Sequence, residues 1–403
     1  MVSVAAHLET VLAATSPLDS AILPLAHARG RVLRGPVRAA VDIPVFDNSA
    51  MDGFAVRSQD VIDVPARLRV VADLPAGTDL DPPLGPGEAA RIMTGSPVPS
   101  AATAIIPFED TAGGLADSLG EIVVTVPPAR DGVYIRRRGG DAVRGSELLP
   151  AGVVLGALQL AAVAAAGVDR VEVTRAPRVA VVSTGSELVA PGTPLRRGQI
   201  PESNGELLAS LAAEAGAEVV LRASVDDDGD GPREAIARAQ ALGADVVVYS
   251  GGVSAGAFEV VKQTLGDVMA FSKVRMQPGK PQGFGRTPSG ILLFGLPGNP
   301  VSAAVSFEVF VRPALLALQG AADLARPVIA LPAGTGWSTP PGRAQYLPVT
   351  IDRRDPRAWR ALPATAGASH LAGGLGRADA YAVVPAEVDA VAEGDIVDVM
   401  LIS

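Results

Sequence analysis

The stretch RVAVVSTGSEL, residues 178–188, carries the clearest indication of the fold. Its first six residues are mostly Val and Ala, which is typical of a strand buried on both faces of a parallel sheet. Strands of the same kind are predicted at 218–224, 245–249 and 291–294, and glycine-rich loops or helical patterns follow them. This alternation predicts a doubly wound, mostly parallel α/β domain over 176–322.

The helices of this domain are predicted from their boundaries. Ser203 and Glu206 match a capping box, and apolar residues then recur at helical spacing. Pro232 suits the first turn of a second helix. A third helix starts near Pro300, and Pro313 is expected to kink or end it, because proline lacks the N–H that a helix interior needs.

The sequence on either side of the α/β domain changes character. Residues 30–140 contain short β-like runs separated by Pro and Gly, which predicts a small β module. An apolar helix is predicted at 155–166 and resembles the N-terminal helix in composition, so the β module is expected to be inserted into a helical domain. The predicted domains are a discontinuous helical domain (1–40 plus 145–175), a β module (41–144), the α/β domain (176–322) and a C-terminal β domain (323–403).

The composition excludes several classes of protein. The 403 residues carry a net charge of −9, and an acidic protein is a poor match for nucleic acid. The absence of cysteine excludes disulfides, thiolate nucleophiles and iron–sulfur clusters. The start of the chain does not match a secretion signal, and the Ala/Gly-rich stretch 151–168 is expected to be a buried helix rather than a membrane span. We therefore expect a cytoplasmic protein with no membrane or nucleic-acid partner.

Three glycine-rich loops leave predicted strands on the same side of the sheet. Ligands of open α/β sheets bind beyond the carboxyl ends of the strands, where glycine allows close backbone approach and helix amides favour anions. Three such loops predict a site for a phosphate-bearing ligand, although tight turns alone would also explain them. The residues concerned are Ser183, Gly185, Gly251, Gly252, Ser254, Pro297, Gly298, Asn299 and Pro300.

An acidic loop, VDDDGD at 225–230, follows the second strand. Mg²⁺ takes oxygen ligands from one or two carboxylates and a phosphate, so this loop predicts a metal site. A solvated acidic turn is the alternative, and Glu187 and Glu259 after neighbouring strands favour the metal. Lys280, inside QPGKP at 277–281, adds a positive charge in a semi-rigid turn and is a reasonable anion ligand.

Seven motifs together resemble one family. They are DNSAMDGFA (47–55), RIMTGSPVP (91–99), STGSELV (183–189), SNG (203–205), SGGVSAG (250–256), QPGKP (277–281) and GLPGNPVS (295–302). In this order they resemble the molybdopterin molybdotransferases, the molybdenum-insertion enzymes of molybdenum cofactor synthesis, which are related to the C-terminal region of gephyrin. The resemblance implies four domains and a homodimer, with the cleft between the α/β domain of one subunit and the β module of the other. It also implies a molybdopterin adenylyltransferase as the upstream partner.

The same resemblance implies an activity and its residues. The activity is insertion of molybdenum from molybdate into adenylylated molybdopterin, with Mg²⁺ or another divalent cation and release of AMP. By position in the motifs, the implied catalytic residues are Asp52, Asp141, Glu187 and Lys280, the implied metal ligands are Asp227 and Glu259, and further implied substrate-binding residues are Thr94, Ser302, Arg343 and Ser369.

Several positions depart from the family pattern. Gln277 stands where a second lysine is common, Glu259 where Asp is common, and Gly140 where Glu is common. The stretch 368–379 around Ser369 also matches poorly. These departures bear mainly on the oxyanion site, because the neutral amide of Gln277 replaces a full positive charge.

Three alternative functions belong to the same group of proteins. A non-catalytic scaffold like gephyrin is disfavoured, because the adenylylating domain and disordered linker of that protein are not found in this sequence. The sibling enzyme that adenylylates molybdopterin is disfavoured by the length of the chain. A paralogue that handles tungstate stays open, since tungstate and molybdate have the same charge and nearly the same size.

Overall fold

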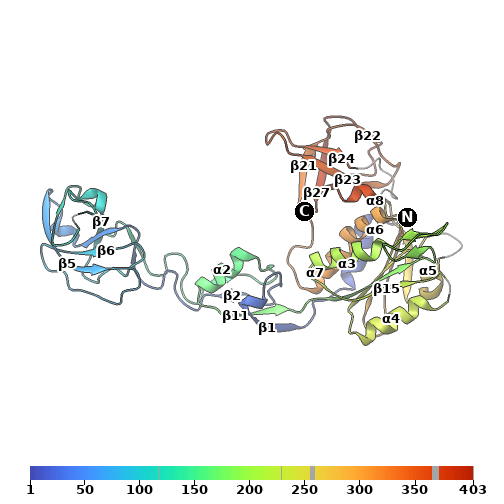
Figure 1. Cartoon of the computed structure of the whole chain (residues 1–403), viewed down its shortest axis with the longest axis horizontal. Helices are drawn as coiled ribbons and strands as arrows, with labels where there is room; N and C mark the ends of the chain where they lie inside the picture. Colours follow the sequence, from blue (N-terminus) through green and yellow to red (C-terminus); the bar gives the residue numbers. More distant parts are fainter. Residues whose placement is uncertain (117, 228, 255–258, 365–371, 403) are drawn as a thin grey trace.

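The structure is a computed structural model that describes residues 1–403 except 117, 228, 255–258, 365–371 and 403. The chain is elongated (Figure 1). The β module lies at one end, and the α/β domain lies beside the C-terminal domain at the other end. A small module that contains helix α2 lies between them. The predicted multidomain architecture around an α/β domain is therefore confirmed.

The α/β domain contains a six-stranded sheet with the order β15-β12-β16-β20-β19-β17. The first four strands run parallel, and β19 and β17 add an antiparallel edge. The sheet is thus mostly parallel, as predicted. Its strands are β12 (Arg178–Thr184), β15 (Glu218–Val225), β16 (Val246–Ser250), β17 (Met269–Lys273), β19 (Pro281–Arg286) and β20 (Leu292–Leu296).

Alternate residues of the central strands enter two different cores. Val179 and Val181 of β12 pack on the side of α3, α6 and α7, whereas Ala180 and Val182 pack on the side of α4 and α5. Because helices cover both faces, β12 is apolar along its length rather than alternating. The helices are α3 (Asn204–Glu214), α4 (Gly231–Ala241), α5 (Val260–Leu265), α6 (Pro300–Ser306) and α7 (Arg312–Leu318).

Of the two effects expected of Pro313, a kink or an end of the helix, the second is not found in the stretch Pro300–Leu318. A π-helical turn, η4 (Phe307–Val311), joins α6 to α7, and the helix continues through Pro313. The wider turn changes the hydrogen bonding just before the proline, so the missing N–H does not end the helix. By length and composition this stretch could cross a membrane, and 89% of its apolar window is buried inside the structure.

The region predicted as a helical domain differs from that prediction. Helix α1 (Val4–Ala13) packs against η4 and α7, so Val11 belongs to the core of the α/β domain. The rest forms a small mixed module, in which β1 pairs with β11 and β2 pairs with β10 beside α2. Apolar spacing predicts a helix but does not show which core that helix joins. The elements of the module are β1 (Ser20–Pro24), β2 (Val37–Arg38), β10 (Glu147–Leu149), α2 (Ala157–Ala165) and β11 (Arg170–Thr174).

The β module is inserted between β2 and β10. Its main sheet has the order β7-β4-β6-β5-β8 and buries Phe54 and Ile106. The strands are β4 (Gly53–Val56), β5 (Ala66–Leu74), β6 (Glu88–Ile92), β7 (Ala104–Pro107) and β8 (Glu121–Val124).

Two chain segments, 41–47 and 136–144, form a neck that connects the β module to the rest of the chain. Ion pairs hold the two segments together. Asp47 accepts bonds from the Arg137 guanidinium at 2.6 Å and from Arg138 N at 2.7 Å. Asp42 accepts from Arg144 N at 2.7 Å and from the Arg138 guanidinium. These donors, first of all the backbone N–H of Arg144, lower the pKa of Asp42. The arginine run at 136–138 therefore contributes two side chains that hold the neck.

The C-terminal domain is a β domain whose sheet includes one short strand from the α/β part of the chain. Its sheet has the order β18-β23-β25-β27-β21, with β24 beside β23. The two-residue strand β18 precedes β19 in the sequence, but it pairs with β23 of the C-terminal domain. The strands are β18 (Met276–Gln277), β21 (Val328–Pro332), β23 (Ala344–Asp352), β24 (Arg360–Pro363), β25 (Ala380–Val384) and β27 (Ile396–Leu401), and the short helix α8 spans Ala372–Leu375.

Candidate active site

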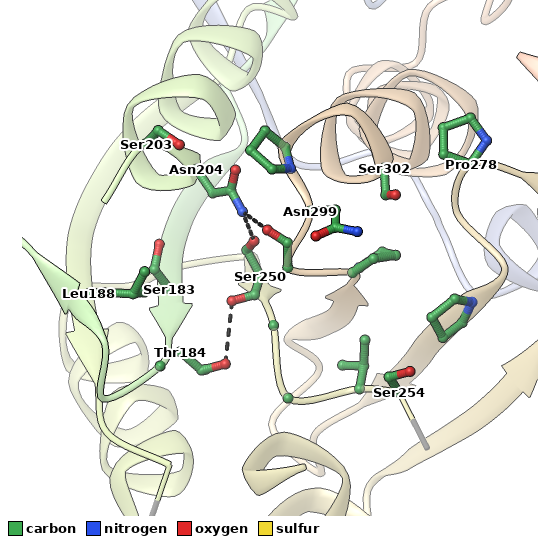
Figure 2. Close-up of a pocket in the computed structure, with 18 of the residues that line it drawn as sticks. Ser183, Thr184, Leu188, Ser203, Asn204, Ser250, Ser254, Pro278, Asn299 and Ser302 are labelled. Carbon is green, nitrogen blue, oxygen red and sulfur yellow. Dashed lines mark hydrogen bonds between the residues drawn. The ribbon is translucent and has the colours of Figure 1, made fainter. Parts of the chain in front are cut away.

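A cleft of about 810 Å³ opens beyond the carboxyl ends of β12, β16 and β20. Its walls come from the loops after these strands and the turn between β18 and β19 (Figure 2). Arg343, just before β23, completes them. The structure brings the following predicted site residues together around it: Ser183, Gly185, Glu187, Asp227, Gly251, Gly252, Ser254, Glu259, Lys280, Pro297, Gly298, Asn299, Pro300, Ser302 and Arg343.

Asn204, the first residue of α3, connects the loops of the cleft. Its side-chain amide donates to Ser250 Oγ at 2.7 Å and to the carbonyl oxygen of Gly298 at 2.6 Å (Figure 2). Only 8% of Asn204 is exposed, so these bonds are shielded from water. The side chain therefore fixes the ends of β16 and β20 against α3. The SNG motif contains Asn204, but nothing in the motif indicates which loops it joins.

Helix α3 begins differently from the predicted capping box. Ser203 makes no side-chain bond to the helix. Glu202 takes this role, because its Oε1 accepts from Gly205 N at 2.7 Å and from Ser183 Oγ at 2.8 Å. Glu206 forms a surface ion pair instead. A carboxylate thus occupies the N-terminus of α3 at the cleft, which leaves anion binding to the other loops.

The loop after β16 requires glycine. Gly251 has φ +99°, and a Cβ at this position would lie 2.6 Å from Thr184 Oγ1 and 2.8 Å from the Thr184 carbonyl oxygen. A side chain would strain the backbone and push apart two loops of the cleft.

Backbone amides hold two acidic side chains of the cleft. Asp227 Oδ2 accepts from Ser186 N at 3.0 Å, and Glu259 Oε2 accepts from Ser254 N at 2.6 Å. Among the described residues, no group of three or more His, Asp or Glu side chains lies close enough to hold a metal ion. Two loop-held carboxylates still suit Mg²⁺, since this ion is usually bound through one or two carboxylates and the phosphates of a substrate.

Lys280 and Arg343 bring positive charge to the cleft from two domains. Pairing of β18 with β23 places Gln277 opposite Gln345, and the Arg343 guanidinium donates to Gln277 Oε1. The neutral amide at 277 therefore orients Arg343, where a lysine would repel it. The contact therefore gives a structural reason for glutamine at 277, where a lysine is common in the family.

The β-module residues lie far from this cleft in the same chain (Figure 1). Asp52 and Thr94 are exposed and contact each other, with Asp52 Oδ1 accepting from Thr94 N at 2.6 Å and from Thr94 Oγ1 at 2.7 Å. Asp141 lies in the neck, where its N–H donates to the carbonyl oxygen of Ile43. Ser369 lies outside the described residues. One chain alone therefore does not bring the three β-module residues to the cleft.

The Asp52–Thr94 contact gives a testable pKa. The hydroxyl of Thr94, followed by its N–H, lowers the pKa of Asp52. Thr94→Val removes the hydroxyl bond, so the pKa of Asp52 is expected to rise toward its ordinary value. A folded-state pKa below the unfolded value stabilises the fold above the unfolded pKa, and that contribution disappears as the pH falls through the folded pKa. The variant should therefore lose less stability on acidification than the parent.

Carboxyl ¹³C shifts of labelled aspartate measure this pKa directly. Thr125→Val is the matched control, because the Thr125 hydroxyl donates to the Asp110 carbonyl in the same module. An Asp52 pKa that is equal in Thr94→Val and in the parent would contradict the assignment.

Comparisons with known proteins agree along the whole chain. Residues 2–167 match the family described as MoeA N-terminal region (domain I and II), 180–317 match a probable molybdopterin binding domain, and 330–402 match MoeA C-terminal region (domain IV). The molybdopterin molybdenumtransferase 2 of Mycobacterium tuberculosis is 42% identical over 92% of both chains. The molybdopterin molybdenumtransferase of a Nostoc species is 40% identical over 78% of this chain and 72% of its own. A solved molybdopterin biosynthesis MoeA protein from Pyrococcus horikoshii is 31% identical, with a TM-score of 0.80 over 100% of this chain and 99% of its own.

Proposed function

The chain belongs to the MoeA family of molybdopterin molybdenumtransferases, and we propose that it takes molybdate and adenylylated molybdopterin as its substrates. It is a transferase of molybdenum cofactor biosynthesis that inserts molybdenum into molybdopterin. The proposal adds three details, which are release of AMP, a requirement for Mg²⁺ and completion of the cleft by a second copy of the chain.

One observation carries this proposal. Asp227 and Glu259 line the same cleft as Lys280 and Arg343, so a single cavity contains carboxylates for a cation and cations for an oxyanion. A substrate with a diphosphate link needs the cation that Asp227 and Glu259 can hold. The molybdate dianion needs the positive charges of Lys280 and Arg343.

Each group of residues has a separate task in the reaction. Lys280 and Arg343 neutralise molybdate next to the dithiolene sulfurs and hold it there. Glu187 orients the water that attacks the adenylate phosphorus, and AMP leaves as the P–O–P link breaks. Asn204 keeps the loops that bind the pterin substrate in register.

Mg²⁺ would be held by Asp227 and Glu259. When bound, this ion supplies Lewis-acid stabilisation of the negative charge that develops on the phosphate oxygens.

The β-module residues reach the cleft from a twofold-related copy. Asp52 and Thr94 belong to the β module and Asp141 to the neck that carries it, and a twofold axis would place each β module at the other subunit's cleft. The reaction is proposed to take place in the cytoplasm, because a dithiolene keeps its sulfurs reduced there. A molybdopterin adenylyltransferase supplies the substrate.

AMP release from adenylylated molybdopterin, measured with and without Mg²⁺ and molybdate, tests the proposal. Glu187→Ala and Glu259→Ala are each expected to slow release by about a hundredfold, and removal of Mg²⁺ should have a similar effect. Glu206→Ala is the matched control, since it removes an acidic side chain from an exposed ion pair on α3. Release rates equal to those of the parent in both cleft variants would exclude the assignment.

A further inference from the structure

Tyr134 of the β module has an unusual backbone conformation. Its φ is +57°, and among the described residues it is the only one other than glycine with a positive φ. The left-handed region is unfavourable for a residue with a Cβ, above all for one with a bulky side chain. Such residues persist where the surrounding structure holds them, and they are concentrated at sites that contact ligands. The conformation therefore marks Tyr134 as a candidate functional residue.

The neighbours of Tyr134 in the sequence hold it in this conformation. Val133 packs against the core of the β module around Phe54. Ile135 packs against the second core of the same module, around Ile105. Because both neighbours are anchored in the interior, the backbone between them is fixed. The Tyr134 side chain is 43% exposed, so the strained backbone presents an aromatic ring to the surface.

Tyr134 lies in the same part of the β module as the Asp52–Thr94 contact. Its carbonyl oxygen accepts from Ala50 N at 2.8 Å, and Ala50 is two residues before Asp52. The two bonds that Asp52 accepts join the Thr94 loop to the same segment. The three loops that carry Tyr134, Asp52 and Thr94 are therefore held together by hydrogen bonds.

An exposed tyrosine is exceptional in this chain. It has four tyrosines, and the other three, Tyr249, Tyr346 and Tyr381, are buried. No other aromatic ring and no guanidinium of the described residues stacks on Tyr134. A tyrosine ring supplies a large and rigid contact surface at a low cost in conformational entropy. The ring is thus available to a planar ligand.

The α/β cleft of one chain offers no such surface. Its described lining residues include carboxylates, cations, hydroxyls and prolines, but no aromatic side chain. The charged residues of the cleft serve the diphosphate link and the molybdate, and neither of these groups contacts the purine at the far end of the substrate. A platform for the purine has to come from outside the cleft of the same chain.

We propose that Tyr134 stacks against the adenine of adenylylated molybdopterin when the β module reaches the cleft of the other subunit. A purine stacks on a tyrosine face without needing any hydrogen bond to its edge. The ring then holds the AMP part of the substrate, while Asp52 and Thr94 approach from the same β module. This inference rests on the proposed function for the substrate and for the shared cleft.

Binding of AMP to the full chain tests the stacking without any turnover. Isothermal titration calorimetry compares AMP with ribose 5-phosphate, which lacks the base. Tyr134→Asn removes the ring, and asparagine adopts the left-handed conformation more readily, so the Tm should be equal or higher while the Kd for AMP rises about tenfold. Tyr134→Phe keeps the stacking face, so its Kd for AMP should stay within twofold of the parent value. Ribose 5-phosphate should bind equally to all three proteins.

Trp359→Ala is the matched control, because it removes another partly exposed aromatic ring, in the C-terminal domain, and should leave AMP binding unchanged. Equal Kd values for AMP in Tyr134→Asn and the parent would overturn the proposal. So would a parent that binds AMP no more tightly than ribose 5-phosphate. A loss in Tyr134→Phe as large as in Tyr134→Asn would also overturn it, since the aromatic face would then not account for the binding.

A kinetic arm shows which ring of the substrate lies on Tyr134. The KM for adenylylated molybdopterin should rise about tenfold in Tyr134→Asn, with less than a twofold change in kcat, because stacking stabilises the bound substrate and the transition state alike. A KM that rises while AMP binding is unchanged would place the ring on the pterin and overturn the adenine assignment. If the parent inserts no molybdenum, the proposed function fails, whereas the AMP titrations still decide the role of Tyr134.

Discussion

Lys280→Ala is expected to reduce molybdenum insertion by about a hundredfold or more. Lys280 lines the cleft, and the other cation of the cleft, Arg343, already donates to Gln277. The chain has no lysine at 277 that could replace the lost charge. A dianion brought into the cleft would then face Glu187 and Asp227 with one cation fewer, so its binding and its approach to the sulfurs both suffer.

Molybdenum incorporated per mole of pterin measures this effect. The loss should be larger for insertion than for AMP release, since the water attack depends on Glu187 and the phosphate rather than on molybdate. Arg238→Ala on α4 is the control for a lost surface charge. Insertion within threefold of the parent rate in Lys280→Ala would remove Lys280 from the oxyanion site.

Glu308→Ala is expected to lower the free energy of unfolding by about 3–5 kcal/mol. Glu308 is 4% exposed and lies in η4, whose apolar residues share a core with Tyr346 and Tyr381 of the C-terminal domain. Its carboxylate accepts from the Arg326 guanidinium at 2.9 Å and 3.0 Å, and Arg312 lies 3.9 Å away. Burial, followed by repulsion from Arg326, already lowers the pKa of Arg312. Without Glu308, two half-buried guanidinium groups face each other with no counter-charge.

Urea denaturation followed by circular dichroism measures this loss. Glu121→Ala is the matched control, because Glu121 pairs with Arg67 on the surface and such exposed pairs contribute no more than about 1 kcal/mol. Equal midpoints for Glu308→Ala and Glu121→Ala would show that the buried cluster does not hold the C-terminal domain in place.

The parallel half of the sheet could be predicted because its strands are buried on both faces. Val179 and Val181 enter one core and Ala180 and Val182 enter the other, so an unbroken apolar run was a sufficient signal. The antiparallel edge could not be predicted in this way. Strand β19 reads PQGFGR, and glycine argues against a strand, yet a Cβ at Gly285 would lie 2.0 Å from the Val268 carbonyl oxygen.

The cleft could be predicted in outline because the carboxyl ends of parallel strands meet at one edge. The bonds within it could not be predicted. Glu202 replaces Ser203 at the start of α3 because the carboxylate reaches both Gly205 and a neighbouring strand, which requires knowledge of their placement. The Arg343–Gln277 contact depends on β18 crossing to the sheet of another domain, and no local pattern indicates such a pairing.

Combining two inactive chains tests whether two subunits share each cleft. Asp52→Ala removes a carboxylate of the β module, and Lys280→Ala removes a cation of the α/β cleft, so each homodimer should insert molybdenum at no more than about 1% of the parent rate. When equal amounts are co-expressed, half of the dimers carry both chains, and each such dimer has one cleft with an intact α/β domain and an intact partner β module. We expect recovery of about a quarter of the parent activity. Activity that stays at the level of the separate variants would contradict a cleft shared between two copies of the chain.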